Sequence, residues 1–554
     1  MKEKIEIIKL IRTKKYVEAE NLINSIIKNG QIDNELIFLQ GIIKANQKKY
    51  IEAKNLLEKF LQNESDHFDG NFNLAGCYHE MGDLENAITY YKKCTVIDPS
   101  NAESFKRLAM CYRFNRKYEK AISNLDISLN IQRTKESILL LGNIYKESGN
   151  FVKAQELFEE IIGSYLDDFE GKLALANLEI DKGNLDIAKN LLQNIFSDPK
   201  KTPEINLRIK IDLAKILMAK GEYEKAIDDY FNMVSIISDP SVSYNLALCY
   251  LFLKRYELGW SYHEERIKLN TFGKLRSRYF SFTKPKWETN RPKKNLLIWG
   301  EQGIGDIILH SQHIDMIKSD FVNLTLAVDE KLISFFAKIY PDIEIIDIEK
   351  MHQYTNYDYH LPIGSLGKNF QKLFKISKLI NRQKYNFDDE RVPEKKNKLR
   401  CGISWQSTNK IFGHKKSIKL DSFNKILDND EIEFINLQFS YDKNEVENME
   451  KKLTKEIFTN HKIDCFNDIK GVASLINSCD LVITISNSNA HIAGKLGIKT
   501  FLLLPYSDGK LWYWGTNDDK QIQWYPSITP IRCNDQNDWK QSISTLNEEL
   551  EKLL

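Results

Sequence analysis

The sequence predicts an all-α helical-repeat superhelix followed by a compact α/β region with parallel sheets, a fold of the α + α/β class. Two observations lead to this prediction. Small residues recur at a nearly constant spacing through the first half of the 554 residues, and short apolar runs alternate with helical stretches through the second half. A chain of this length is also too long for a single hydrophobic core, so separate units are expected.

Small residues mark the repeat in the first half. An alanine recurs at intervals of 34, 34, 34, 33, 34 and 38 residues, and an aromatic residue or leucine stands three positions before each copy. From the second copy on, a glycine or alanine also stands twelve positions before the alanine. Small residues let two antiparallel helices approach closely, and a period of about 34 residues is typical of tetratricopeptide repeats. The three series are Ala19, Ala53, Ala87, Ala121, Ala154, Ala188 and Ala226; Tyr16, Tyr50, Leu84, Tyr118, Phe151, Leu185 and Tyr223; and Gly41, Ala75, Ala109, Gly142, Ala176 and Ala214.

This pattern predicts a tetratricopeptide-repeat solenoid over residues 1–268, made of about seven to eight helix pairs. Each pair buries its apolar face only against its neighbours, so the array forms a superhelix with a concave groove. Such a groove suits an extended peptide or another protein, which we expect as a partner. A rigid spacer or an oligomerisation surface is the alternative, because a fold alone does not fix a function.

Composition narrows the classes of function and compartment. The 79 basic and 77 acidic residues nearly cancel to a formal charge of +2, and a nucleic-acid binder normally carries a basic excess, so no nucleic-acid partner is expected. The eight cysteines are scattered without metal-ligand spacing, which favours free thiols in a reducing compartment. No apolar run reaches the ~20 residues of a membrane span, and the N-terminus mixes both charges, so we expect neither a transmembrane segment nor a secretory signal. The expected location is the cytoplasm.

The second half changes from the helical repeat to alternating strands and helices. After a linker expected at 269–294, this alternation argues for parallel sheets with crossover helices. A charged, proline-containing break at 388–398 separates a lobe at 295–390 from a lobe at 398–554. Two Rossmann-like lobes facing each other across a cleft form the GT-B architecture. The expected strands are 295–299, 322–328, 344–348, 357–361, 400–405, 433–437, 480–485, 500–504 and 529–532.

A glycine-rich loop, GEQGIGD at 300–306, follows the first of these strands and opens a helix. Its glycines allow a ligand to approach backbone amides closely, which predicts an acceptor or phosphate loop at Glu301, Gln302, Gly303 and Gly305. The spacing departs from the dinucleotide GxGxxG order, which argues against NAD binding. Asp306 falls in the first helical turn, where the helix dipole favours a carboxylate. It is either a helix-capping acid or a general base that removes a proton from an acceptor hydroxyl.

Two further loops follow strands of the second lobe. The loop at 406–417 is polar and basic and lies where α/β sheets bind ligands, so Lys415 or Lys416 could neutralise a diphosphate; a solvated lysine pair is the alternative. The segment at 485–497 runs from a strand into a helix whose N-terminal amides can face a phosphate without a metal. For His491 alone, a packing role is the default interpretation. We expect no metal site.

Motifs from about residue 260 to the C-terminus agree in order and spacing with one known family. They are GWSYHEER at 259–266, PKW at 285–287, WGEQGIGD at 299–306, GISW at 402–405, SNSNAHIAGKLG at 486–497, LLLP at 502–505, WYW at 512–514 and WYPS at 524–527. This set resembles bacterial tetratricopeptide-repeat proteins that end in a heptosyltransferase-like domain of glycosyltransferase family nine. The resemblance implies a GT-B fold and Asp306 as the catalytic base. It implies that Ser486, Asn487, Ser488 and His491 face the nucleotide or diphosphate of the donor. We expect Gln406, Lys415, Lys416 and Gln438 to complete the donor-binding side.

Two hypotheses about function remain open at this point. In the first, the chain is an inverting, metal-independent glycosyltransferase with no cofactor beyond its nucleotide-sugar co-substrate, and the repeats present a protein acceptor; a surface polysaccharide or lipid-linked glycan is the alternative acceptor. In the second, the chain is a non-catalytic scaffold with a degenerate transferase-like domain. Many family members carry an Asp where this chain has Ser486-Asn487, which favours the scaffold. Gly303, Gly305, Asp306 and His491 together favour the enzyme.

Overall fold

The computed structural model describes residues 2–28, 33–165, 168–269, 279, 282–370, 385–408, 413–440, 442–453, 455–506, 510–534 and 538–554. The chain divides into two compact units, Met1–Ile205 with Ile267–Ser281, and Asn206–Arg266 with Phe282–Leu554. The expected linker at 269–294 and the loop at 406–417 lie partly outside the described residues. Among the described residues, no helix combines the length and the apolar character needed to cross a membrane.

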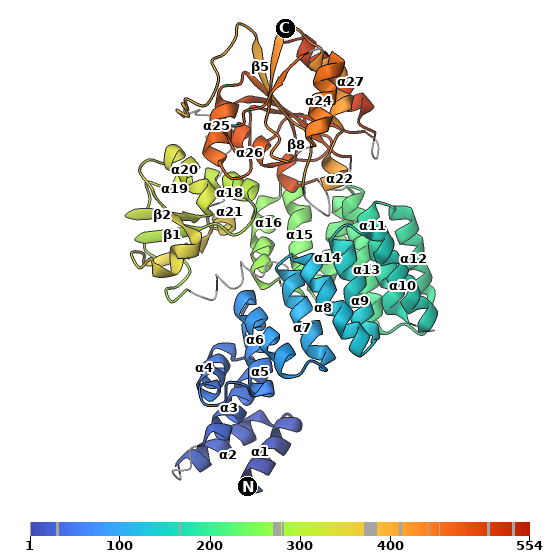
Figure 1. The fold of residues 1–554 in the computed structure, drawn as a ribbon, viewed down its shortest axis with the longest axis vertical. Coiled ribbons are helices and arrows are strands. Elements are labelled where there is room, and N and C mark those ends of the chain that lie inside the picture. The colour runs from blue at the N-terminus through green and yellow to red at the C-terminus, as the bar shows by residue number, and fades with distance from the viewer. Residues whose placement is uncertain are drawn as a thin grey trace. The chain divides into compact units, whose positions relative to one another are not determined.

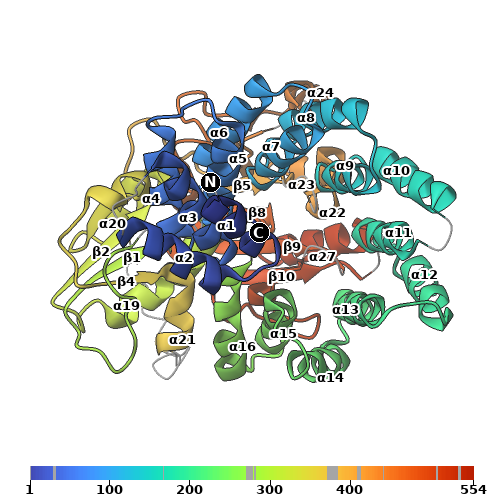
Figure 2. The same cartoon turned by 90° about the horizontal axis from the view of Figure 1, so that it is seen from below.

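The first unit is an array of helix pairs (Figure 1), in which successive helices contact each other in chain order. Figure 2 shows this succession along α7 to α12. Its helices are α1 (Lys2–Arg12), α2 (Tyr16–Lys28), α3 (Asn34–Asn46), α4 (Tyr50–Leu61), α5 (Phe68–Glu80), α6 (Leu84–Ile97), α7 (Ala102–Phe114), α8 (Tyr118–Ile131), α9 (Lys135–Glu147), α10 (Phe151–Ser164), α11 (Phe169–Lys182) and α12 (Leu185–Ser197). The pattern continues in α13 (Pro203–Ala219), α14 (Tyr223–Val234), α15 (Pro240–Phe252) and α16 (Tyr256–His263). Every second helix therefore begins at the aromatic residue or leucine of the sequence repeat.

Small residues lie where the two helices of a pair touch. All seven recurring alanines are fully buried. Where a glycine stands on the first helix, a large side chain of the second helix fills the space beside it. A Cβ atom on Gly41 would lie 2.8 Å from Cγ of Leu57, and one on Gly142 would collide with the ring of Phe158. Close packing of the pairs thus depends on the small residues that the spacing predicted.

Every turn inside a helix pair has a residue in the left-handed conformation two positions before the second helix. Gly82, Gly149, Gly183 and Gly221 occupy four of these turns, with φ between 80° and 86°. The other four turns hold lysine or arginine at φ between 55° and 61°, although a left-handed backbone costs a non-glycine residue roughly 1–2 kcal/mol. These residues are Lys14, Lys48, Arg116 and Lys254.

Arg116→Gly is expected to raise the free energy of unfolding by about 0.5–1 kcal/mol, because relief of the left-handed conformation exceeds the extra chain entropy of glycine. Gly149→Arg in the equivalent turn is expected to lower it by a similar amount. The two turns are bonded alike, since the Arg116 amide donates to the Arg113 carbonyl at 2.9 Å and the Gly149 amide to the Lys146 carbonyl at 3.1 Å. Urea unfolding followed by circular dichroism measures both changes. A destabilised Arg116→Gly protein would contradict this account of the turns.

Among its described residues, the second unit contains two sheets whose neighbouring strands are all parallel. In the described part of the chain, the first sheet has the order β3-β2-β1-β4, with β1 (Asn295–Trp299), β2 (Asn323–Val328), β3 (Glu344–Asp347) and β4 (Tyr359–Pro362). Helices α18 (Ile304–His310), α19 (Ile314–Ile317), α20 (Glu330–Ile339) and α21 (Leu366–Phe370) accompany it. The apolar side chains of β1 are fully buried, as expected for a strand covered on both faces.

The second sheet has the order β10-β9-β8-β5-β6-β7. Its strands are β5 (Leu399–Ser404), β6 (Ile432–Asn436), β7 (Ile457–Phe458), β8 (Leu481–Ile485), β9 (Lys499–Leu504) and β10 (Ile528–Arg532). The helices around it are α22 (Gly413–Lys416), α23 (Asn424–Leu427), α24 (Lys443–Leu453), α25 (Ile469–Asn477), α26 (Ser488–Leu496) and α27 (Lys540–Glu551). The nine strands expected from the sequence are present within one or two residues of their predicted bounds. The two-residue strand β7 was missed because it is too short to show a period.

Helices α15 and α16 share a hydrophobic core with the segment that follows β9. The indole of Trp260 in α16 lies 5.3 Å from that of Trp512, and the Trp512 indole lies 5.4 Å from that of Trp524, measured between ring centres. Trp512 belongs to the short helix η9 (Trp512–Trp514). A Cβ atom on Gly367 of α21 would collide with the Trp260 ring. The last helix pair is therefore packed into the α/β unit.

Candidate functional site

The three loops predicted to carry chemistry all follow strands at which the strand order reverses. In the first sheet the order reverses between β1 and β4, and in the second between β5 and β8. Open parallel sheets bind ligands outside the carboxyl ends of strands at such points. The glycine-rich loop follows β1, the basic loop follows β5, and α26 follows β8. The topology thus places each predicted loop where a ligand is expected.

Asp306 lies in the first turn of α18, whose N-cap is Gly303. Its side chain is half-buried, and the hydroxyl of Tyr513 in η9 donates to Oδ1 over 3.5 Å. Burial raises the pKa of Asp306 to about 6, against the opposing effects of the Gly303 amide and the charge of Lys416. A carboxyl group with such a pKa can accept a proton near neutral pH.

Lys416 from the second lobe is the cation that acts on Asp306. Only 7% of the residue is exposed, and burial lowers the pKa of its ammonium group while the charge of Asp306 opposes that shift. Lys416 is the last residue of α22, in the basic loop that follows β5. Lys415 beside it is half-buried, and residues 409–412 of the same loop lie outside the described part of the chain.

Gly305 and His491 bring the two lobes into contact. A Cβ atom on Gly305 would lie 2.6 Å from Cδ2 of the His491 ring, so only glycine leaves room for the imidazole. His491 lies in α26, and its Nδ1 is 3.0 Å from the hydroxyl of Tyr525. Burial, together with the charge of Lys416, lowers the pKa of His491 to about 3, so the imidazole is neutral at physiological pH.

The start of α26 is capped by its own chain. The side-chain oxygen of Asn487 accepts from the amides of Asn489 at 3.0 Å and Ala490 at 3.4 Å, as is common for an asparagine at the N-cap. Ser486 accepts a hydrogen bond from the indole of Trp514 at 2.9 Å. Ser488 is the first helical residue and is half-buried.

Gln406 and Gln438 join the ends of β5 and β6. Oε1 of Gln438 accepts from the amides of Trp405 at 3.0 Å and Gln406 at 2.9 Å, and Nε2 of Gln406 donates to Glu445 at 3.0 Å. Gln438 is almost fully buried. These contacts hold the basic loop against the sheet, and the structure does not bring either amide group into contact with Asp306.

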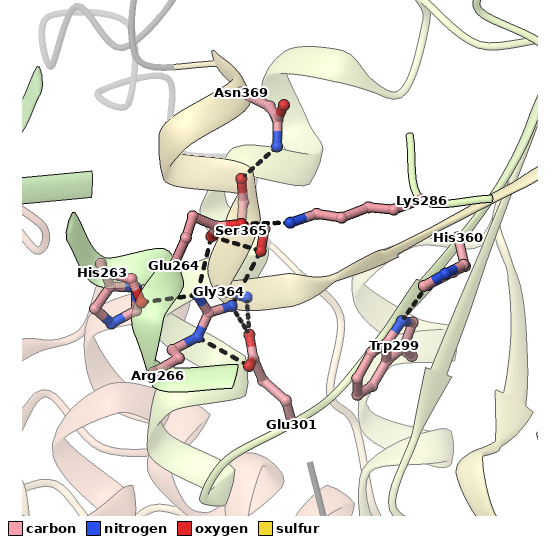
Figure 3. Close-up of polar contacts among 10 residues, drawn as sticks. All are labelled: His263, Glu264, Arg266, Lys286, Trp299, Glu301, His360, Gly364, Ser365 and Asn369. Carbon is pink, nitrogen blue, oxygen red and sulfur yellow. Dashed lines mark hydrogen bonds and ion pairs between the residues drawn. The ribbon is translucent and has the colours of Figure 1, made fainter. Parts of the chain in front are cut away.

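Glu301 and Gln302 differ in their surroundings. The Glu301 carboxylate is buried in a bidentate ion pair with Arg266, at 2.7 and 3.0 Å (Figure 3). Gln302 is half-buried, and among the described residues its Nε2 has no hydrogen-bond partner. Gly303 is exposed at the tip of the loop.

Three residues that contact predicted site residues do not follow from the sequence reasoning. Tyr513, Tyr525 and Arg266 lie in motifs that mark the family resemblance, but nothing in the local pattern shows which loop they approach. Tyr513 touches Asp306, Tyr525 touches His491, and Arg266 holds Glu301. Their place inside these motifs is the signal that the sequence offers.

Comparison with known proteins identifies the repeats. Tetratricopeptide-repeat family models match residues 68–101, 90–123 and 173–240. The chain therefore contains tetratricopeptide repeats, as the spacing predicted, and these indicate a protein-interaction scaffold.

Curated relatives and solved structures resemble parts of the chain. Protein FlbA of Caulobacter vibrioides is 24% identical over 56% of this chain and 55% of its own length, and BBSome complex member BBS4 of Bos taurus is 22% identical over 32% and 33%. The chain thus spans about half of FlbA and a third of BBS4. A crystal structure of a tetratricopeptide repeat protein from Parabacteroides merdae is 20% identical, covering 45% of this chain and 97% of that chain at a TM-score of 0.40.

Proposed function

We propose that the repeats recruit a protein partner and that the two α/β lobes transfer a sugar from a nucleotide donor to a hydroxyl group of that partner or of a glycan, in a GT-B arrangement. The observation that supports the transfer is the carboxyl group of Asp306, whose pKa is raised by burial and whose charge interacts with that of the buried Lys416 of the other lobe. Together they offer a proton acceptor and a cation at the carboxyl ends of parallel strands.

In the proposed reaction, the acceptor oxygen attacks the anomeric carbon of the sugar and gives its proton to the Asp306 carboxylate. The bond between that carbon and the diphosphate oxygen breaks, and its electron pair leaves with the diphosphate. Lys416 neutralises the departing negative charge, which stabilises the transition state. Attack from the side opposite the leaving group inverts the anomeric configuration.

Titration calorimetry with UDP, ADP, GDP and CMP, without added metal, tests the donor site. We expect one nucleoside diphosphate to bind selectively, and Lys416→Met to weaken that binding by about 10- to 100-fold, because a hydrogen bond to a charged group contributes roughly 1.5–3 kcal/mol. Lys451→Met, which changes an exposed lysine of α24, is the matched control.

A specific observation also favours a non-catalytic scaffold. Asn487 already satisfies two amides at the start of α26, where a phosphate would otherwise bind. If the folded protein binds none of the four nucleotides, the transferase proposal fails and the scaffold is favoured. Capture of a partner by the repeats then becomes the function to measure.

A further inference from the structure

A buried network of charges joins the end of the last helix pair to the glycine-rich loop (Figure 3). Arg266 lies in η1 (Glu264–Lys268), directly after α16, and is fully buried. Its Nε and Nη2 donate to the two oxygens of Glu301 at 3.0 and 2.7 Å. The same Glu301 Oε1 accepts the amide of Gly364 at 2.5 Å.

All five N–H groups of Arg266 have acceptors. Besides its two bonds to Glu301, the guanidinium donates to Glu264 at 2.9 Å, to the His263 carbonyl at 3.1 Å and to Ser365 at 3.1 Å. Glu264 is in turn paired with Lys286. Two cations therefore face two carboxylates, and the network is neutral as well as saturated with hydrogen bonds.

Stability alone does not explain this arrangement. Buried ion pairs can usually be replaced by apolar residues of similar size without loss of stability, because removing charges from water costs about as much as their attraction returns. A bidentate guanidinium–carboxylate pair fixes orientation much more narrowly than apolar packing does. The network is therefore better suited to fixing the position of the segments that it joins than to stabilising the fold.

The position that it holds is that of the loop carrying Asp306. Glu301 stands five residues before Asp306, and between them the chain turns through Gly303 into α18. The loop has little freedom on the other side, because a Cβ atom on Gly364 would collide with the Glu301 carboxylate and one on Gly305 with His491. The charge of Glu301 also acts on Asp306 and raises its pKa, after the larger effect of burial.

We propose that Arg266 and Glu301 are positioning residues, which hold the glycine-rich loop so that the Asp306 carboxylate meets the acceptor hydroxyl. This inference rests on the proposed transfer function. It makes the end of the last helix pair part of the transfer machinery, and it assigns Glu301 to the support of the loop instead of to ligand binding.

The test compares the full-length variant Arg266→Met/Glu301→Gln with the wild type. The double change leaves no unpaired charge, and the amide oxygen of the glutamine can still accept from Gly364, so the protein is expected to fold. The matched control is Arg400→Met/Glu433→Gln, which removes a similarly buried ion pair of 2.8 Å at the amino ends of β5 and β6. Sugar transfer from the nucleotide sugar whose nucleotide binds is measured for all three proteins.

We expect kcat of the site variant to fall by about 100-fold with KM for the donor unchanged, since a shift of about 1 Å in a reacting group costs that much. The control is expected to keep the wild-type kcat. In the single variant Glu301→Gln, the acidic limb of the pH profile is expected to move to lower pH, because a charge that raises the pKa of Asp306 is lost. A loss of folded protein would lower kcat without moving that limb.

The outcomes separate the two proposals. An active wild type whose site variant keeps its kcat, or whose Glu301→Gln profile is unchanged, overturns the positioning role alone. A wild type that binds a nucleotide but transfers no sugar overturns the transfer function, and the positioning role with it.

Discussion

Asp306→Asn is expected to reduce sugar transfer by at least 100-fold, because an amide cannot take the proton of the acceptor hydroxyl and general base catalysis typically contributes about 10²- to 10⁴-fold. Nucleotide binding is expected to persist, since the nearby cation Lys416 remains in place. Initial rates at saturating donor, measured together with calorimetric titration of the nucleotide, separate the two effects.

The same substitution is expected to stabilise the protein at neutral pH. The pKa of Asp306 is raised from 3.8 to about 6, so the folded wild type holds this proton more tightly than the unfolded chain does. Its free energy of unfolding therefore falls as the pH rises from 3.8 to about 6, and it stays lower at higher pH. Asparagine carries no charge and avoids this loss, which amounts to about 1–3 kcal/mol at pH 7. Greater stability with less activity would mark Asp306 as a functional residue. Unchanged turnover in the variant would rule out its role as the base.

Acid is expected to destabilise the second unit through the histidines around Trp260. His263, His310 and His313 are buried within 5.3–6.1 Å of the Trp260 ring. Burial lowers the pKa of His313 to about 4 and holds that of His310 well below 6.5, helped by the charges of the neighbouring histidines and Arg266. Below pH 6.5 these side chains take up protons only when the protein unfolds. The contribution of these histidines to stability is therefore fully present above pH 6.5 and is lost as the pH falls toward 4.

Each such histidine removes up to about 1.4 kcal/mol of unfolding free energy per pH unit below 6.5. His310→Phe retains a ring of similar shape and is expected to flatten this dependence, whereas His352→Gln, at an exposed position of η4 (Ile348–Gln353), leaves it unchanged. Urea unfolding at half-unit steps between pH 7.5 and 5 measures the slope. An equal slope in the wild type and in His310→Phe would contradict burial as the source of the acid sensitivity.

The parts of the fold that follow from local periodicity could be predicted from the sequence. Tyr118 begins α8 and Ala121 is fully buried in it, because a repeat of about 34 residues imposes the same contact on every pair. Strand β1 coincides with the apolar run between the linker and the glycines. Asn487 caps α26 because its short polar side chain reaches back to free amides of the first turn.

Contacts between distant segments could not be predicted in this way. The glycines around Glu301 predict a ligand loop, but no local pattern indicates that Glu301 also pairs with Arg266, which lies 35 residues earlier in η1. The donor-side role of Gln438 stays a prediction, and its hydrogen bond to the Trp405 amide could not be foreseen from the sequence. A periodic pattern predicts which residues of one helix or strand share a face. Contacts between distant residues depend instead on how whole helices and strands pack together.

The close fit between Trp260 and Gly367 bears on how such a chain can be rearranged by recombination. Residues 1–205 belong to one compact unit, and helix pairs of a repeat array contact mainly their neighbours, so we expect these pairs to tolerate duplication, loss or exchange. An exchange that replaced α16 and η1 would have to supply an aromatic ring that packs against Gly367 of α21 and an arginine that pairs with Glu301. We therefore expect chimeric proteins to tolerate crossover points within α13. The helix pairs after that point are expected to be exchanged only together with the two sheets.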